Sequence, residues 1–292
     1  MVCYFSEGDD MNTKMLNHEQ VLALLPDRDN NAHKGDFGKV LLLCGSEGYT
    51  GAAALAAMGA LRCGAGLVYL GVPRSIYAIE AVKLTEPIVF PLPEAEGKLS
   101  GEALPKILAM LSSMDAVLIG PGLGQSEGTR SVIRTVLEEA KCPVVLDADG
   151  INGICRHRDI LRERHYPTIL TPHAGEFQRL GGEVSGDRLA SAQRFAQEYG
   201  CILLLKGHHT VITDGEESYV NQTGNPGMAV GGSGDVLAGM ITGLLGQGLS
   251  PLTAAACGAW LHGAAGDLCA KELGQYAMLP TDMLEVLGRL LK

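Results

Sequence analysis

Short apolar runs alternate along the chain with stretches whose apolar residues recur at helical spacing. The apolar runs predict strands at residues 40–44, 67–71, 116–120, 144–147, 168–170, 202–206 and 210–213. The helical spacing predicts helices between them, at residues 51–63, 127–140 and 188–199. Several of the strands are almost continuously apolar, as in parallel sheets that helices cover on both faces. The alternation therefore predicts an α/β sandwich with a mostly parallel central sheet.

The chain is expected to form a single domain over residues 17–292. No Pro/Ser-rich linker, internal repeat or low-complexity block divides it, and its most polar segment, residues 91–101, is expected to be a surface loop. Asn17 stands three residues before Gln20, which is the spacing of a capping box at a helix start. Residues 1–16 are expected to be a loosely ordered leader, and after Asp235 we expect helices to the end of the chain.

A stretch without charged residues, 236–266, raises the question of a membrane span. A spanning helix needs about 20 continuous apolar residues. Here Gly246-Gln-Gly-Leu-Ser-Pro251 divides the stretch, and much of the remainder is Ala and Gly. Two buried helices that pack through small residues are therefore favoured over a membrane hairpin.

Composition narrows the class of protein further. The 292 residues include 39 glycines, nearly twice the usual ~7%, which must serve turns, close backbone approaches or tight packing. The formal net charge of −10 and the lack of a basic run give no support for binding nucleic acid or a membrane. Residues 1–14 lack the apolar core of a signal peptide, and the eight cysteines form no Cys-x-x-Cys pair. We therefore expect a cytoplasmic protein with reduced thiols.

The strongest candidate site is a glycine-rich segment that ends in an acidic residue. It reads Gly224-Asn-Pro-Gly-Met-Ala-Val-Gly-Gly-Ser-Gly-Asp235 and directly precedes an apolar helical stretch, residues 236–245. Glycines let successive N–H groups converge on one anion, and the helix N-terminus adds partial positive charge. Asp235 falls at the cap or first turn of the helix, where Asp is also an ordinary capping residue. A carboxylate beside bound phosphate is unfavourable unless it has a task, so we interpret Asp235 as the acceptor of a proton from an attacking hydroxyl.

Two further glycine loops follow predicted strands, at the sheet edge where open α/β proteins bind ligands. They are residues 45–51 and 120–124, and each fits ligand approach as well as close packing. The first is not a P-loop, because no Lys-Ser/Thr follows its last glycine.

Polar residues follow the remaining strands. Asp147 and Asp149 have the chemistry of magnesium ligands, although an ordinary turn role is slightly favoured. His173 and Glu176, taken alone, fit the polar first turn of a helix. Lys206 fits a phosphate contact as well as a solvated hairpin lysine. No His or Cys spacing is typical of a metal site, and no Gly-x-Ser-x-Gly elbow occurs.

Six motifs occur in the order found in a known family. They are Asn31-Ala-His-Lys-Gly-Asp-Phe-Gly38, residues 45–54, Gly120-Pro-Gly-Leu-Gly124, Leu170-Thr-Pro-His-Ala-Gly-Glu176, Lys206-Gly-His-His-Thr210 and residues 224–235. In these motifs, from about residue 26 onward, the sequence resembles the ADP/ATP-dependent NAD(P)H-hydrate dehydratases. The resemblance implies their ribokinase-like fold, a three-layer α/β/α sandwich with a mostly parallel central sheet.

The resemblance also implies a reaction. The family repairs NADHX and NADPHX, the hydrated and redox-inactive forms of NADH and NADPH, by converting (6S)-NAD(P)HX and ADP into NAD(P)H, AMP and phosphate with Mg²⁺. Eukaryotic members use ATP instead. Hydroxide is a poor leaving group, so phosphorylating the hydroxyl of the hydrate makes elimination feasible. Asp235 would deprotonate that hydroxyl, and an anion hole would stabilise the transferring phosphoryl group. The anion hole consists of Gly231, Gly232, Ser233 and Gly234.

Further roles follow from the resemblance, position by position. The hydrated nucleotide would contact Ala52, Gly122, His173 and Asp235. The adenosine phosphate would contact Lys206, Gly207, His208, His209, Thr210 and Gly234. Glu176 ends a segment that replaces the magnesium-binding Asn-x-x-Glu motif of related kinases, so it is expected to act on Mg²⁺ through water. Val230 and Ser233 stand where the family usually has Thr, and of the two only Ser233 keeps the hydroxyl.

The resemblance implies a homotetramer and a functional partner, NAD(P)HX epimerase. Some members carry an N-terminal epimerase domain, which residues 1–16 are too few to form, so the epimerase is expected to be a separate protein. The main rival is a ribokinase-like kinase of a vitamin precursor such as hydroxyethylthiazole or hydroxymethylpyrimidine. Residues 33–38 and 171–176 argue against it. A nucleotide-binding regulator without catalysis is the other rival, and Asp235 argues against that, because pure binding gains nothing from a carboxylate beside phosphate.

Overall fold

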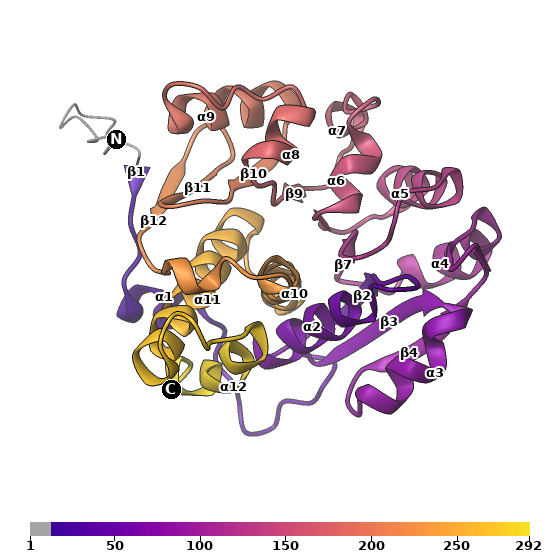
Figure 1. Ribbon diagram of the computed structural model, residues 1–292, viewed down its shortest axis with the longest axis horizontal. Helices are drawn as coiled ribbons and strands as arrows, with labels where there is room; N and C mark the ends of the chain where they lie inside the picture. The colour runs from indigo at the N-terminus through magenta and orange to yellow at the C-terminus, as the bar shows by residue number, and fades with distance from the viewer. Residues whose placement is uncertain (1–12) are drawn as a thin grey trace.

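A ten-stranded sheet runs through the computed structural model, which describes residues 13–292 (Figure 1). The strands lie in the order β1-β12-β11-β10-β9-β8-β7-β2-β3-β4. Their bounds are β1 (Thr13–Lys14), β2 (Lys39–Leu43), β3 (Leu67–Pro73), β4 (Ile88–Leu92), β7 (Ala116–Ile119), β8 (Val144–Leu146), β9 (Thr168–Leu170), β10 (Ile202–Leu205), β11 (Thr210–Thr213) and β12 (Ser218–Asn221). Strand β11 is antiparallel to β10 and β12, and the other neighbouring strands of this sheet are parallel. The prediction of a mostly parallel central sheet is confirmed.

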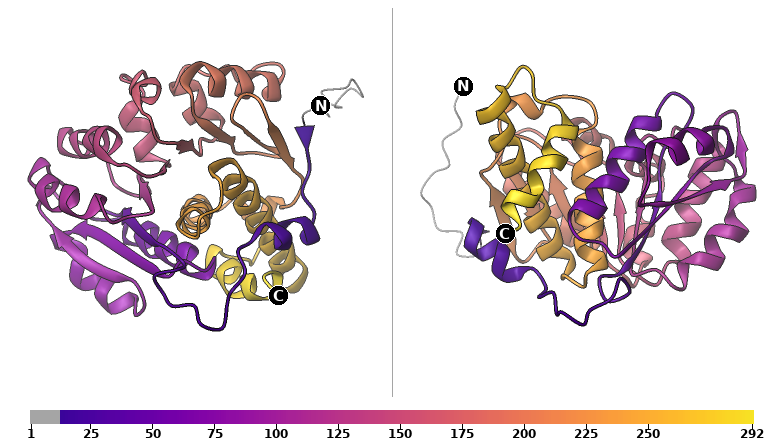
Figure 2. Two further views of the ribbon diagram at one scale, coloured as in Figure 1. Left: turned by 180° about the vertical axis from the view of Figure 1, so that it is seen from behind. Right: turned by 90° about the horizontal axis from the view of Figure 1, so that it is seen from below.

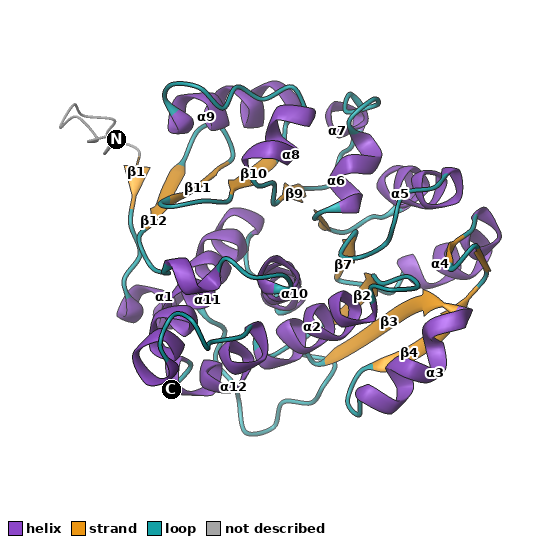
Figure 3. Cartoon of the chain, in the orientation of Figure 1, coloured by secondary structure: helices purple, strands orange, loops and turns teal. Residues whose placement is uncertain are grey.

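Helices cover both faces of the sheet (Figure 1, Figure 3). One face carries α1 (His18–Leu24), α2 (Thr50–Arg62), α3 (Arg74–Lys83), α10 (Ser233–Gly246), α11 (Pro251–Leu273) and α12 (Pro280–Leu290). The opposite face carries α4 (Leu104–Leu111), α5 (Glu127–Glu139), α6 (Asp149–Ile154), α7 (Ile160–Glu163), α8 (Ala174–Arg179) and α9 (Arg188–Tyr199). The three-layer α/β/α sandwich is thereby confirmed.

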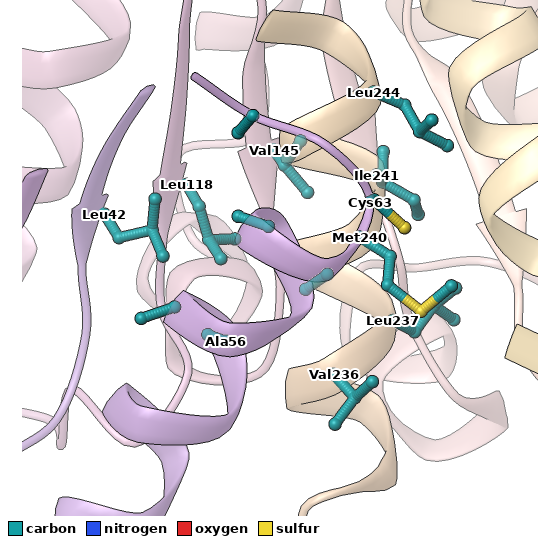
Figure 4. Packing of buried hydrophobic residues seen from close by; sticks show 14 of the residues in the cluster. Leu42, Ala56, Cys63, Leu118, Val145, Val236, Leu237, Met240, Ile241 and Leu244 are labelled. Atoms are coloured by element: carbon teal, nitrogen blue, oxygen red, sulfur yellow. The ribbon is translucent and has the colours of Figure 1, made fainter. Parts of the chain in front are cut away.

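The sheet has a separate hydrophobic core on each face, because successive side chains of a strand point to opposite sides. In β2, Leu41 belongs to the core beneath α4 to α9, whereas Leu42 belongs to the core beneath α2 and α10. Figure 4 shows this second core, in which Leu42 and Leu118 pack with Ala56 of α2 and Met240 of α10. The strands are continuously apolar because both of their faces are buried.

Helices α2 and α10 approach each other closely through glycine. A Cβ atom on Gly239 would lie 2.0 Å from the carbonyl oxygen of Ala56, and one on Gly243 would lie 2.4 Å from that of Ala60. The stretch 236–266 forms most of α10 and part of α11, so the prediction of two buried, small-residue helices is confirmed. No helix within residues 13–292 combines the length and the apolarity that crossing a membrane requires.

The first described helix lies beside the last two (Figure 2). His18 of α1 stacks on Trp260 of α11 and donates a hydrogen bond, 2.8 Å long, to the carbonyl oxygen of Leu290. The predicted capping box is confirmed, because Asn17 and Gln20 exchange two hydrogen bonds of 2.9 Å.

Part of the expected leader belongs to the sheet. Residues 1–12 lie outside the described residues, but Thr13–Lys14 form β1, which pairs with Ser218 and Tyr219 of β12. The seven cysteines between residues 13 and 292 are free thiols, as predicted, and Cys3 lies outside the described part.

The prediction of a surface loop at residues 91–101 is wrong in part. Strand β4 ends at Leu92, and a two-stranded hairpin follows, formed by β5 (Glu94–Ala95) and β6 (Lys98–Leu99). Leu92 and Leu99 are buried, so the segment contributes to the core. Prolines hide this strand from sequence patterns, and β4 tolerates Pro91 because it is the edge strand of the sheet.

Candidate active site

The residues selected from the sequence gather at the carboxyl ends of the parallel strands. The loop 45–51 follows β2, the loop 120–124 follows β7, Asp147 follows β8, His173 follows β9 and Lys206 follows β10. Because these strands are neighbours in the sheet, their loops share one edge, which is where open α/β folds bind ligands.

Asp235 lies in the first turn of α10, as the sequence indicates. The helix begins at Ser233, and Gly232 caps it with φ +97°, a backbone conformation that favours glycine. Burial and, to a smaller extent, the negative charge of Asp147 raise the pKa of Asp235 to about 6, against the opposing effect of the Lys206 charge. A carboxyl group with this pKa is mostly ionised near neutral pH and is a stronger proton acceptor than a surface aspartate.

Lys206 and Asp147 form an ion pair beneath this helix start. The Lys206 Nζ atom lies 2.8 Å from Asp147 Oδ1, which also accepts a hydrogen bond of 2.7 Å from Thr171 Oγ1. A Cβ atom on Gly234 would lie 3.2 Å from Lys206 Nζ. Burial disfavours the charge of Lys206, but the carboxylates of Asp147, Glu176 and Asp235 outweigh it and raise the pKa of the lysine.

This ion pair bears on two questions that the sequence leaves open, namely the role of Lys206 and the roles of Asp147 and Asp149. The Lys206 side chain is 22% exposed, so it is not the solvated hairpin lysine. Asp147 is buried in the ion pair, whereas Asp149 accepts a hydrogen bond of 2.9 Å from the N–H of Gly124. The two carboxylates thus have different partners, and the turn role that the sequence slightly favours is also present at Asp147, because its carbonyl oxygen accepts a hydrogen bond of 2.9 Å from the N–H of Gly150.

His173 and Glu176 form a capping box at the start of α8. The Nδ1 atom of His173 accepts a hydrogen bond of 3.0 Å from the N–H of Gly175, and Glu176 Oε2 accepts one of 2.9 Å from the N–H of His173. Since Nδ1 accepts, the neutral imidazole carries its proton on Nε2. Each residue thus has the local role that the sequence indicates, and His173 also lines the cavity described next.

A cavity of about 840 Å³ is lined in part by Ser233 and Gly234, two residues of the expected anion hole. Its lining includes the residues expected to contact the adenosine phosphate: Lys206, Gly207, His208, His209, Thr210 and Gly234. His208 and His209 stack with ring centroids 3.9 Å apart. The remaining walls come from the loop after β12 and from α11, which contributes Ala259, His262 and Gly263.

Ala52 and Gly122, together with Asp235, lie outside the lining of that cavity. They are nevertheless neighbours, because a Cβ atom on Gly122 would lie 2.7 Å from Ala52 Cβ. The two glycine loops are joined by hydrogen bonds from the Gly45 N–H to the Pro121 carbonyl and from Ser46 Oγ to the Gly122 carbonyl, each 2.8 Å long. Gly122 therefore serves close packing, whereas a Cβ atom on Gly48 or Gly51 would meet no described atom within 4 Å.

Metal ligands are sparse. Within the part of the chain that the structure describes, no three His, Cys, Asp or Glu side chains are grouped to hold a metal ion. Magnesium usually retains several waters and binds through one or two carboxylates and the phosphates of a substrate. Glu176, which is buried at the site, fits the indirect role expected of it, because one of its oxygens is occupied by the His173 N–H.

Two residues at the site, Arg188 and His262, were not predicted from the sequence. Arg188 at the start of α9 donates hydrogen bonds to the carbonyl oxygens of Leu205, Lys206 and His208, and so holds the loop 206–210. His262 lies 3.3 Å from Ser233 Oγ. A signal for His262 exists in the sequence, because it is the one titratable side chain other than cysteine in the stretch 236–266.

The fold places this protein among the ribokinase-like proteins. A ribokinase-like superfamily protein from Enterococcus faecalis has a TM-score of 0.86 and 28% identity, with 100% of this chain and 98% of that one covered. Residues 40–289 match the family model of the NAD(P)H-hydrate dehydratases, and the chain belongs to that family.

Individual relatives agree with the family. The bifunctional NAD(P)H-hydrate repair enzyme Nnr of Moorella thermoacetica is 46% identical over 96% of this chain, which spans about half, 54%, of that relative. The ADP-dependent (S)-NAD(P)H-hydrate dehydratase of Bacillus subtilis is 36% identical over 97% of this chain and 99% of its own length. A crystal structure of the B. subtilis ADP/ATP-dependent enzyme, co-crystallized with ATP and Mg²⁺, has a TM-score of 0.82 and 34% identity and covers 96% and 98% of the two chains.

Proposed function

We propose that this protein is an ADP-dependent NAD(P)H-hydrate dehydratase that converts (6S)-NADHX and NADPHX into NADH and NADPH. ADP is consumed to AMP and phosphate, and ATP is the alternative nucleotide. The observation that carries the proposal is the carboxyl group of Asp235 in the first turn of α10, beside the Lys206–Asp147 ion pair and the edge of a nucleotide-sized cavity. Membership of the dehydratase family supports the same reaction.

The first step is a phosphoryl transfer. Asp235 accepts the proton of the substrate hydroxyl, whose oxygen forms a bond to the terminal phosphorus of ADP while the bond from that phosphorus to AMP breaks. The main-chain N–H groups of residues 231–234 and the Lys206 ammonium stabilise the charge on the moving phosphoryl group. Phosphate then leaves from the ring carbon, a proton is lost from the neighbouring carbon, and the ring double bond is restored.

ADP and the hydrated nucleotide bind in two neighbouring regions of the site. ADP occupies the cavity, where Lys206, Gly207, His208, His209, Thr210 and Gly234 contact it. The hydrated nucleotide binds against Ala52 and Gly122, outside the lining of the cavity, and against His173, which the two binding regions share. Mg²⁺, held by the phosphates and by Glu176 through water, would neutralise phosphate charge. In the cell we propose a cytoplasmic homotetramer that receives its substrate from an NAD(P)HX epimerase.

The test is recovery of absorbance at 340 nm from hydrated NADH with Mg²⁺ and either ADP or ATP. We expect recovery with ADP and formation of AMP and phosphate in equal amounts. Failure with both nucleotides would contradict the proposal, and recovery with ATP alone would overturn the choice of ADP. A stable phosphorylated product without NADH would favour the kinase reading instead.

Asp235→Asn is the matched test of the base. The variant keeps the size of the side chain and one acceptor oxygen but cannot accept the proton, so turnover should fall to background while ADP still binds. Turnover near that of the unmodified protein would remove Asp235 from the mechanism.

A further inference from the structure

His262 is a buried polar residue to which the proposed reaction gives no task. His262 belongs to α11 and the residue is 7% exposed, yet it contributes to the lining of the cavity. Buried polar groups in proteins are hydrogen-bonded, and His262 Nε2 lies 3.3 Å from Ser233 Oγ. Ser233 is itself buried and is the first residue of α10, within the expected anion hole.

We propose that His262 is a positioning residue of the anion hole, which orients the Ser233 hydroxyl toward the transferring phosphoryl group; this rests on the proposed function. In this arrangement the imidazole N–H donates a hydrogen bond to Ser233 Oγ, and the serine O–H donates to a phosphoryl oxygen. The anion hole then combines main-chain donors with one side-chain hydroxyl.

The imidazole performs this task as a neutral group. Burial lowers the pKa of His262 to about 4; the positive charge of Lys206 acts in the same direction, and a hydrogen bond with the Ser233 backbone opposes the shift. A neutral imidazole still has one N–H donor. His262 therefore orients the Ser233 hydroxyl and does not take the substrate proton that Asp235 removes.

The backbone around His262 is held by hydrogen bonds from the end of β12 and the loop that follows it. Asn221 Nδ2 donates a hydrogen bond of 3.2 Å to the carbonyl of Ala259, and Thr223 Oγ1 donates one of 2.9 Å to that of Trp260. Thr223 also packs directly on Gly263, where a Cβ atom would lie 2.2 Å from Thr223 Oγ1. The side chain that orients Ser233 is therefore on a supported element, as preorganised sites require.

The test compares an apolar and a conservative replacement of His262. His262→Leu fills the space without a polar atom, whereas the amide of His262→Gln reaches about as far as Nε2. We expect His262→Leu to lower kcat on the order of 10- to 100-fold, with the KM for ADP changed less than about threefold. His262→Gln should recover most of this loss. A Leu variant with unchanged kcat, or a Gln variant no faster than Leu, would overturn the inference.

A double-mutant cycle separates positioning from a general effect on the core. Ser233→Ala should slow turnover as much as His262→Leu, and the double variant should be no more than about twofold slower than the slower single variant. If the loss in the double variant equals the product of the two single losses, the two residues act independently. That result would reject the relay, in which His262 orients Ser233 and Ser233 contacts the phosphoryl group.

Ser233→Thr is the matched control and leaves α11 untouched. It retains the hydroxyl and should keep most of the activity that Ser233→Ala loses. If His262→Leu fails to fold, these two serine variants carry the test, and equal rates for them would overturn the relay. An unmodified protein without activity would reject the proposed function together with the relay, whereas an active protein with normal variants would reject the relay alone.

Discussion

Lys206 Nζ lies 2.8 Å from Asp147 Oδ1, although 59 residues separate the two along the chain. They meet because β8, β9 and β10 are consecutive in the sheet, with all three strands parallel, so that the residues following them share one edge. Thr171, which follows the middle strand, also donates to Asp147. Three neighbouring strand ends thus form one buried network directly below the helix start that carries Asp235.

Asp147→Asn should shift the acidic limb of the pH–rate profile to lower pH. The negative charge of Asp147 is one cause of the raised pKa of Asp235, which is about 6, and the positive charge of Lys206 opposes it. Removing the carboxylate leaves the lysine unopposed, so Asp235 ionises at lower pH. Profiles of kcat/KM between about pH 4.5 and 8 measure the shift. Glu138→Gln, on the exposed surface of α5, is the control, and a limb that stays in place or moves upward contradicts this explanation.

Asp235→Asn should stabilise the fold at neutral pH. The folded protein raises the pKa of Asp235 from 3.8 to about 6. The stability that this group contributes is therefore fully present below pH 3.8 and is lost as the pH rises through about 6. The amide does not ionise, so the variant should gain about 1–3 kcal/mol at pH 7 and nothing near pH 3. Denaturant unfolding at the two pH values checks this. An equal effect at both would show that ionisation is not its cause.

Arg188→Leu should raise the KM for ADP on the order of tenfold with a smaller effect on kcat. Its guanidinium group donates to the carbonyl oxygens of Leu205, Lys206 and His208, so its loss releases the loop 206–210. Arg194→Leu removes an arginine of the same helix that pairs with Glu183 on the surface, and should have the KM of the unmodified protein. Equal KM values for the two variants would remove Arg188 from the positioning of the loop.

Gly239→Ala should lower the free energy of unfolding by about 3 kcal/mol. The added Cβ atom would lie 2.0 Å from the Ala56 carbonyl oxygen, so α2 and α10 would have to separate. Gly288 is the matched helical control, because a Cβ atom there would meet no described atom within 4 Å. Gly288→Ala should therefore raise stability by about 0.5–1 kcal/mol. Urea unfolding measures both, and a tolerated Gly239→Ala would contradict the close approach of the helices.

Much of the fold could be predicted because its strands are buried on both faces. Strands β7 and β10 are apolar throughout and β2 is apolar after Lys39, and this pattern identifies them without knowledge of their neighbours. Strand β4 was missed because it lies at the sheet edge, where Pro91 is tolerated and Ile88 is 43% exposed. Its pattern is set by the position of the strand in the sheet, which local periodicity does not report.

The sequence by itself determined the strand and helix alternation, the family and the position of Asp235 in the first turn of a helix, because each depends on residues that are close together in the chain. Only the tertiary structure decided which distant groups meet. It paired Asp147 with Lys206, placed Asp149 against the N–H of Gly124, and brought His262 of α11 to Ser233 of α10. These pairings depend on strand order and helix packing, and the raised pKa of Asp235 depends on the burial and the neighbouring charges that only the folded chain creates.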